Sequence, residues 1–538
     1  MWERFTRRKV LTGIGAGTTA AVAGCTGGDG TDTATDTTAT DGNGEETPTA
    51  TNAPESQLAD DLTVALPVDP TLGVWSVYGG VTPYYTNVLE PLIWVSDDME
   101  LVPWLASDWK STGEKSWEFT IRDGVTFHNG ETLTAEHVVW SFETILNEWS
   151  YAPGWLHLKP ENVTALDDRT VEFVTTDVFP TFPGTIAHNM VAVQHPDRSR
   201  EDKTVIGTGP YQVSNREKGQ RIETEAFGDY WNGKTRMGSM TFRVITDPTT
   251  RSLALENNEV DVAYAPPSSK IDSLENGENT SVSTQTSPGA MYVGLHNYKA
   301  PTDDAKLRKA LNWATSQQTL VDTILNGIGI PARGPVAKSI YWSAHENLPA
   351  YERDVEKASS LVEESSYDGE ELNFLINNAT PGGRTIASAL QEWYSEIGVE
   401  VGIQQVEESA FEDAVRNGDG HLVLESSGSN SGAADYLIYE TFHSEGDVNE
   451  RLYNEEDTGV YNPGGEVDTL IEEGFQTGDK EQKEEKYEQA LQIIMDEEAA
   501  VVPLTYQEYV VGTYEDVNGL DLRPINEMAR WTSTEHLK

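Results

Sequence analysis

The chain has 538 residues, with 89 acidic against 37 basic side chains and a formal net charge of −52 at pH 7. Such a charge excludes nucleic acid as a natural partner, because phosphate recognition needs clusters of Lys and Arg. The length allows about two to four domains, and the single cysteine excludes an internal disulfide or a cysteine metal cluster.

The first residues have the layout of an export signal, with a basic start, a short apolar middle and a small-residue cleavage site. Residues 7–11 (RRKVL) resemble a twin-arginine signature, and residues 22–25 (VAGC) resemble a lipobox. The alternative, a membrane span, needs about 18 apolar residues, more than this stretch offers. We therefore expect a signal peptide over residues 1–24, lipidation at Cys25, and retention on the extracellular face of the cell membrane.

A low-complexity segment follows the cysteine. Residues 26–58 consist largely of Thr, Asp, Gly, Ala and Glu, and no apolar side chain larger than Ala occurs before Leu58. Such a composition cannot bury enough surface to fold. The sequence predicts a disordered linker over 25–58, including the lipidated cysteine, with the folded body beginning near Asp61.

Alternating apolar residues predict short strands in the first half of the folded body. These strands are expected at 62–66, 117–121, 171–173 and 240–244. Between them, apolar residues at helical spacing from Ala135 to Leu146 predict a helix, with Thr134 as its N-cap.

The second half predicts a β-α-β-α-β run and therefore a parallel sheet. Its strands are expected at 372–376, 399–403 and 421–424, with helices at 386–397 and 410–416; further helices are expected at 307–314, 320–325 and 487–495. Ligands of such sheets bind at the carboxyl ends of strands. The segment from Glu425 to Tyr436 leaves the third strand at that end and is predicted to be a pocket loop, with a plain surface loop as the alternative.

The motifs of common enzymes are missing from the sequence. Residues 428–432 (GSNSG) resemble the nucleophile elbow of serine hydrolases but carry Asn430 at the central position. Neither a phosphate-binding Gly-rich loop with Lys nor a His-Glu-x-x-His zinc helix occurs. We therefore predict no catalytic residue and no cofactor, with an exported hydrolase as a distant alternative and a structural surface protein disfavoured by the lack of repeats.

Several motifs, in order, resemble the extracellular solute-binding proteins of the peptide/nickel class, family 5, which serve ATP-binding-cassette (ABC) importers. The motifs are Glu90-Pro91-Leu92, residues 105–109 (LASDW), residues 117–130 (WEFTIRDGVTFHNG), residues 133–138 (LTAEHV), residues 207–211 (GTGPY), Asp229-Tyr230-Trp231, Val260-Asp261-Val262 and residues 307–311 (LRKAL). The resemblance covers about residues 60 to 515. One departure is His137, where the family usually has Asp. The dispersed acidic surface also resembles proteins of salt-loving archaea.

The resemblance implies an α/β fold of two lobes that close over a ligand about a hinge. It places the first lobe at 59–289, the second at 290–499, and a return to the first lobe at 500–538, with crossings near Pro288 and Val501. It also implies a monomer that binds a solute, catalyses no reaction and delivers the solute to ABC permease subunits. Residues 127–130 are then a structural turn.

The sequence predicts the protein family more specifically than it predicts the solute. The ligand contacts that we expect are Trp75, Tyr78, Ser427, Gly428, Ser429, Asn430, Asp435, Tyr436 and Tyr506. The resemblance favours a peptide or similar small polar solute, with Ser429 where the dipeptide branch has a pocket Asp. A nickel chelate is the alternative, with His443 as a possible metal contact.

Overall fold

The computed structural model describes residues 60–69, 85–149, 152–197, 205–428, 435–446, 449, 465–525 and 529–537. The expected signal peptide, Cys25 and the linker lie outside these ranges, as do Trp75, Tyr78, Ser429 and Asn430. Among the helices within the ranges, none combines the length and the apolar character needed to cross a bilayer.

The strands are short except for two. They are β1 (Asp61–Leu66), β2 (Ile93–Val95), β3 (Leu101–Pro103), β4 (Ala106–Ser111), β5 (Ser116–Ile121), β6 (Val163–Asp167), β7 (Thr170–Val174), β8 (Tyr211–Glu217), β9 (Arg221–Ala226), β10 (Ser239–Val244), β11 (Val262–Tyr264), β12 (Thr280–Leu295), β13 (Ile330–Pro331), β14 (Leu372–Asn377), β15 (Val401–Val406), β16 (Leu422–Gly428), β17 (Val501–Tyr514), β18 (Val517–Asn518), β19 (Asp521–Leu522), β20 (Ala529–Arg530) and β21 (Glu535–His536).

The helices alternate with strands mainly in the second half of the chain. They are α2 (Ala135–Glu148), α3 (Ala152–Leu156), α4 (Phe182–Thr185), α5 (Pro248–Glu256), α6 (Ser268–Glu275), α7 (Ala305–Ala314), α8 (Gln317–Thr319), α9 (Val355–Glu363), α10 (Gly383–Glu396), α11 (Glu408–Arg416), α12 (Asp435–Phe442), α14 (Glu466–Gln476) and α15 (Lys480–Gln492). The short helices are η1 (Pro160–Asn162), η2 (Asn189–Val191), η3 (Leu320–Ile324), η4 (His345–Asn347), η5 (Ile493–Glu497) and η6 (Trp531–Ser533).

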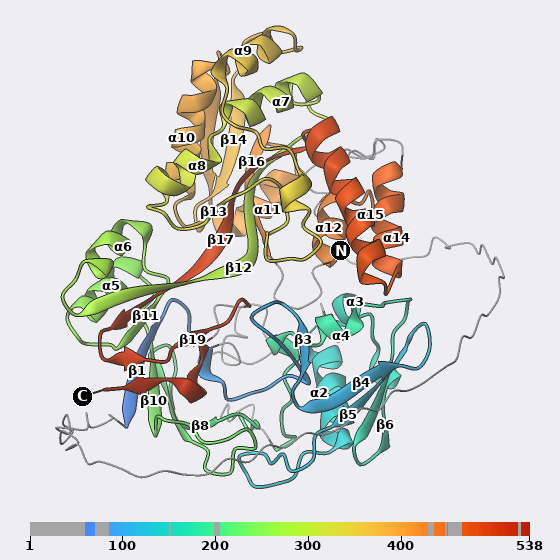
Figure 1. Cartoon of the computed structure of the whole chain (residues 1–538), viewed down its shortest axis with the longest axis vertical. Helices are drawn as coiled ribbons and strands as arrows, with labels where there is room; N and C mark the ends of the chain where they lie inside the picture. The colour runs from blue at the N-terminus through green and yellow to red at the C-terminus, as the bar shows by residue number, and fades with distance from the viewer. Residues whose placement is uncertain are drawn as a thin grey trace, which may run out of the picture. The chain divides into compact units, whose positions relative to one another are not determined.

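One large sheet runs through the molecule in the order β15-β14-β16-β12-β17-β11-β1-β10-β9-β8, with β13 paired to β17. The long strands β12 and β17 pair antiparallel in its middle, and Figure 1 shows them side by side, with β14 and β16 near one end and β1, β10 and β11 near the other. Their register shifts between Thr286 and Ala290. The two halves of the fold therefore share the two strands that connect them.

The β14–β15–β16 part of the sheet confirms the parallel run that the sequence predicts. β14 pairs parallel with both β15 and β16. Phe374 and Ile376 pack in a core with α7 and α10, whereas Leu375 packs in another core with α11 and α15. Helices thus cover both faces, as apolar strands of a parallel sheet require.

The first half of the chain builds a smaller four-stranded antiparallel sheet in the order β4-β5-β7-β6. Its apolar side chains share one core with α2, in which Phe119 and Phe142 are fully buried. The helix begins at Ala135 with Thr134 as its N-cap, as predicted. The turn at residues 127–130 closes with a hydrogen bond of 2.8 Å from Gly130 N–H to Phe127 O.

The structure differs from the sequence-based expectations at the end of β16 and in the helix after α7. The expected pocket loop starts too early, because residues 425–428 continue β16 and pair antiparallel with β12. The alternation of small and polar residues there does not resemble a core strand, and only pairing with β12 reveals it. The helix expected at 320–325 is a π-helical turn, η3, which follows the short α8.

Candidate functional site

The carboxyl end of β16 places three of the expected ligand contacts in one region. Ala290 of β12 is paired with Ser427 of β16 on one side and with Tyr506 of β17 on the other. Ser427 is half-buried, and its Oγ donates to Pro335 O at 3.5 Å. Gly428 is exposed at the end of the strand. The structure thus brings Ser427, Gly428 and Tyr506 to one region.

Tyr506 is fully buried, and its hydroxyl has a complete set of partners. The hydroxyl oxygen accepts hydrogen bonds from Arg333 N–H at 3.2 Å and Gly334 N–H at 3.3 Å, and it contacts His345 Nδ1 at 2.9 Å. Burial raises the pKa of Tyr506 to about 12. A neutral, saturated hydroxyl holds the side chain in place, and the protein covers the whole side chain, ring included.

Asp435 is held by a buried ion pair. It begins α12, is buried, and accepts a hydrogen bond of 2.6 Å from Lys483 Nζ of α15, which is equally buried. The pair connects α12 to α15. Removing either partner would leave the other charge buried without compensation, so the pair is expected to stabilise this contact. Tyr436 follows on the same helix.

His443, the possible metal contact, is buried after the end of α12. Its Nδ1 accepts a hydrogen bond of 3.0 Å from Glu445 N–H, and its Nε2 lies 3.3 Å from Glu472 Oε1. Its ring stacks on Tyr439 with ring centroids 4.2 Å apart. Both ring nitrogens are therefore engaged within the protein.

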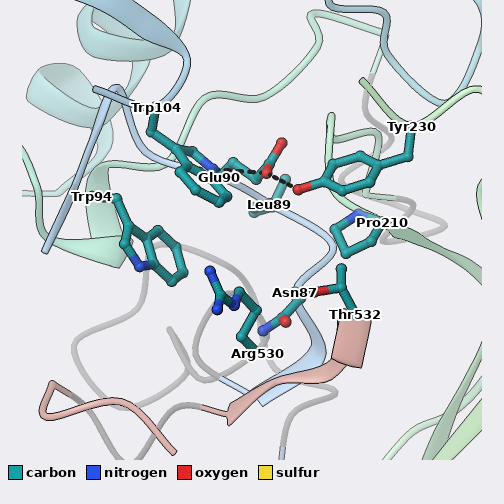
Figure 2. Close-up of a pocket in the computed structure, with 9 residues that line it drawn as sticks. All are labelled: Asn87, Leu89, Glu90, Trp94, Trp104, Pro210, Tyr230, Arg530 and Thr532. Carbon is teal, nitrogen blue, oxygen red and sulfur yellow. Dashed lines mark hydrogen bonds between the residues drawn. The ribbon is translucent and has the colours of Figure 1, made fainter. Parts of the chain in front are cut away.

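A pocket that the sequence analysis did not predict lies beside Glu90. It encloses about 280 Å³ of space, part of which is open to solvent. As Figure 2 shows, its walls come from segments far apart in the chain: Asn87, Leu89, Glu90, Trp94, Trp104, Pro210, Tyr230, Arg530 and Thr532. The indoles of Trp94 and Trp104 stack with ring centroids 4.8 Å apart. The pocket combines an aromatic wall with the Arg530 guanidinium, and its walls lie close together.

Glu90 accepts hydrogen bonds at both carboxylate oxygens. Trp104 Nε1 and Tyr230 OH donate to Oε1, each at 2.8 Å, while Thr208 Oγ1 at 2.7 Å and Trp231 Nε1 at 3.0 Å donate to Oε2. Burial raises the pKa of Glu90, and the four donors oppose that rise. The carboxylate is thus a structural anchor for the pocket wall.

The two glycines of residues 207–211 allow this segment to pack closely beside Glu90. A Cβ on Gly207 would lie 2.0 Å from Val88 O, and one on Gly209 would lie 2.0 Å from Asn87 O. Only glycine therefore allows this segment to approach the chain preceding Glu90. The motifs at residues 90–92, 207–211 and 229–231 were visible in the sequence, but nothing local indicated that they meet.

The region at the end of β16 offers main-chain groups and hydroxyls rather than an activated nucleophile. Ser427 Oγ donates to a carbonyl instead of to a base, and Ser287 Oγ accepts a hydrogen bond of 3.0 Å from Gly289 N–H. Nucleophilic catalysis needs a nucleophile within reach of a general base. These contacts suit reversible binding instead.

The sequence pattern of the bacterial extracellular solute-binding proteins, family 5 Middle, matches residues 100–449. The probable D,D-dipeptide-binding periplasmic protein DdpA of Escherichia coli K12 is 27% identical over 434 residues, which cover 79% of this chain and 82% of DdpA. The nickel-binding periplasmic protein of the same organism is 28% identical over 400 residues, covering 67% and 74% of the two chains. The fold is similar to NikA from Staphylococcus aureus in complex with Ni(L-His)2, with a TM-score of 0.72, 21% identity, and coverage of 89% of this chain and all of NikA.

Proposed function

Because the chain belongs to family 5 of the bacterial extracellular solute-binding proteins, which are not enzymes, we propose that it captures a peptide or similar small polar solute between two lobes and delivers it to an ABC permease. The match over residues 100–449 carries this proposal. Relatives named for dipeptides and for nickel give the chain its class, that of a solute-binding protein of ABC importers for peptides or nickel.

The part of β16 at Ser426 and Ser427, beside which no described strand lies on one edge, favours a peptide as the solute. The strand pairs with β12 along its whole length, whereas its other neighbour, β14, pairs only at Leu422 and Val423. No described strand covers the edge that passes Ser426 and Ser427. Successive residues of a strand direct their main-chain groups to opposite edges, so one of the two serines presents its N–H and C=O there. An extended peptide recognised in this way gains main-chain hydrogen bonds.

The two lobes are proposed with the boundaries expected from the sequence, 59–289, 290–499 and 500–538. The register shift between Thr286 and Ala290 supports a first crossing near Pro288. The same irregularity falls between Tyr506 and Glu508 on β17, which lies after the second crossing that we propose near Val501. A ligand that contacts both lobes would favour the closed state by its differential affinity. Trp75, Tyr78, Ser429 and Asn430 remain proposed contacts beside Ser427 and Gly428, together with Asp435, Tyr436 and Tyr506.

A nickel chelate is the second candidate, supported by the nickel-binding relative. Its weakness lies at His443, whose two ring nitrogens already contact Glu445 N–H and the Glu472 carboxylate. Ligation of nickel by this imidazole would require both contacts to break. We therefore rank the chelate below the peptide.

We propose the cellular location of the protein from the first residues of its sequence. Export by the twin-arginine route and lipidation at Cys25 would hold a monomer on the extracellular face of the membrane, with residues 26–58 as a spacer. The net charge of −52 suits concentrated salt, in which repulsion between surface carboxylates is screened.

A thermal-unfolding screen in molar salt tests the solute. Short peptides, Ni²⁺ with histidine, and sugars are added separately, and a true ligand at about 100 times its Kd stabilises the fold by about 2.7 kcal/mol. A peptide that stabilises is then compared with its backbone N-methylated analogue, which should lose the effect because it lacks main-chain donors. A shift with Ni²⁺ and histidine but with no peptide would reverse the ranking, and a hydrolysed peptide would remove the proposal.

A further inference from the structure

Three metal-ligating side chains converge in the first half of the fold, in a cluster that the proposed solute site does not use. Glu131 precedes α2, His137 lies in the first turn of α2, and His195 lies after η2. One ligand atom from each lies within 4.8 Å of the other two. We infer that these residues form a binding site for one borderline divalent transition-metal ion such as Zn²⁺.

The distances suit such an ion. Glu131 Oε2 lies 2.9 Å from His195 Nε2, and Glu131 Oε1 lies 3.4 Å from His137 Nε2. Ligand atoms on a zinc tetrahedron, with bonds of about 2.1 Å, are about 3.4 Å apart. The two contacts use different oxygens of Glu131, so the side chains must move until one ligand atom from each residue, now within 4.8 Å of the other two, reaches this spacing. Two His and one Glu leave a fourth position for water, as in open zinc sites.

The two imidazoles are held in place, while the carboxylate can move. His137 is 9% exposed and His195 is 3% exposed, and the ring of Phe127 packs against both, with centroids 5.0 Å away. The Glu131 side chain is 56% exposed. The ion would enter from the solvent side and bind first to the carboxylate and then to two preorganised nitrogens.

The surroundings provide for the change of tautomer that metal binding requires. Without a metal, His137 Nδ1 accepts Thr134 N–H at 3.2 Å and His195 Nδ1 accepts Asp197 N–H at 3.1 Å, so both Nε2 atoms carry protons toward Glu131. Binding through Nε2 moves each proton to Nδ1. Thr134 Oγ1, 2.8 Å from His137 Nδ1, can then accept one of these protons, whereas Asp197 Oδ2, 3.8 Å from His195 Nδ1, must first move closer to accept the other. Each Nδ1 also gives up the main-chain N–H that it accepts in the metal-free state. Such partners orient ligating histidines.

The choice of ion follows from the donor set. Imidazole nitrogens favour Zn²⁺, Ni²⁺ and Cu²⁺, whereas Mg²⁺ and Ca²⁺ favour oxygen ligands. The many surface carboxylates of this chain can bind Mg²⁺ weakly, so an excess of Mg²⁺ occupies them without filling a site built from two imidazoles. The bound ion would connect the turn at residues 127–131, the start of α2 and the segment after η2.

Calorimetric titration of the chelator-treated full chain with Zn²⁺, in molar NaCl and excess Mg²⁺, tests the inference. We expect one Zn²⁺ per chain, an affinity at least about tenfold lower in Glu131→Gln, and a change below about twofold in the matched control Glu136→Gln, an exposed carboxylate one residue before His137. Saturating Zn²⁺ should raise Tm by about 2–3 °C at a hundredfold excess over Kd.

A second variant tests whether an imidazole binds the ion, separately from the carboxylate. His137→Gln preserves an acceptor for Thr134 N–H, since Gln serves at this position of capping boxes, but removes the metal-binding nitrogen. It should retain the wild-type Tm without metal and lose the Zn²⁺-dependent rise. Binding of several ions per chain, displacement by Mg²⁺, or equal weakening by Glu131→Gln and Glu136→Gln would overturn the site. The comparison of Glu131→Gln with Glu136→Gln does not depend on which solute the protein carries.

Discussion

Replacing Glu90 by Gln tests whether the buried carboxylate anchors the pocket wall. The carboxylate accepts two hydrogen bonds at each oxygen, one of each pair from an indole N–H of Trp104 or Trp231. A glutamine amide has one acceptor oxygen and one donor NH2 group. The hydroxyls of Tyr230 and Thr208 can turn to accept from that group, but an indole N–H cannot. Either orientation of the amide leaves one indole donor facing another donor.

The magnitude follows from the partners that are lost. An unsatisfied buried donor costs about 1–3 kcal/mol, and hydrogen bonds to a charged acceptor are worth about 1.5–3 kcal/mol each. The variant also gains, since a neutral amide avoids part of the desolvation that raises the pKa of Glu90. We expect Glu90→Gln to lower the free energy of unfolding by about 2–3 kcal/mol at neutral pH.

The same variant should change the pH dependence of stability. The pKa of Glu90 in the fold is raised above the ordinary value of 4.5. Its contribution to stability is therefore fully present below pH 4.5 and is lost as the pH rises through the raised value. Gln lacks this titration, so the difference between wild type and variant should be largest at acidic pH and should shrink as the pH rises.

Urea unfolding at constant molar salt, followed at several pH values, measures both effects. Glu225→Gln is the matched control, because Glu225 is exposed on β9 and accepts only from the half-buried Gln212 side chain in the described contacts. It should change stability by less than about 0.5 kcal/mol. Wild-type stability in Glu90→Gln, or a difference that widens with pH, would refute the reasoning.

Two further predictions use matched pairs in the same unfolding assay. Gly209→Ala should lower the free energy of unfolding by at least about 2 kcal/mol, because the added Cβ would lie 2.0 Å from Asn87 O. The control Gly228→Ala should be nearly neutral, because no atom lies within 4 Å of the added Cβ. Equal effects of the two substitutions would contradict the packing argument. Lys483→Met should lower the free energy of unfolding by about 3–5 kcal/mol, because it leaves Asp435 buried without its cation. The control Lys486→Met breaks the more exposed pair with Glu473 and should lower it by less than about 1 kcal/mol. A neutral Lys483→Met would mean that the buried pair does not hold α12 to α15.

Local sequence patterns were sufficient to predict a helix or strand where one face of that element is buried. The stripe from Ala135 to Leu146 predicted α2, and alternation predicted β5 and β10, because burial of one face leaves a regular period in the sequence. The β-α-β-α-β run predicted the parallel pairing of β14 with β15 and β16 because parallel strands need a crossover connection, usually a helix. Prediction failed at residues 425–428, where the strand is held by pairing with β12 rather than by an apolar face.

By itself, the sequence determined the class of fold, the order of most elements and the family, because these depend on periodicity and on motifs of neighbouring residues. Only the tertiary structure decided which polar groups meet. Thr208 reaches Glu90 from 118 positions away, and His195 and Glu131 are 64 positions apart. Contacts at such separations leave no local period, and against a background of 89 acidic residues no single carboxylate is distinctive until its partners surround it.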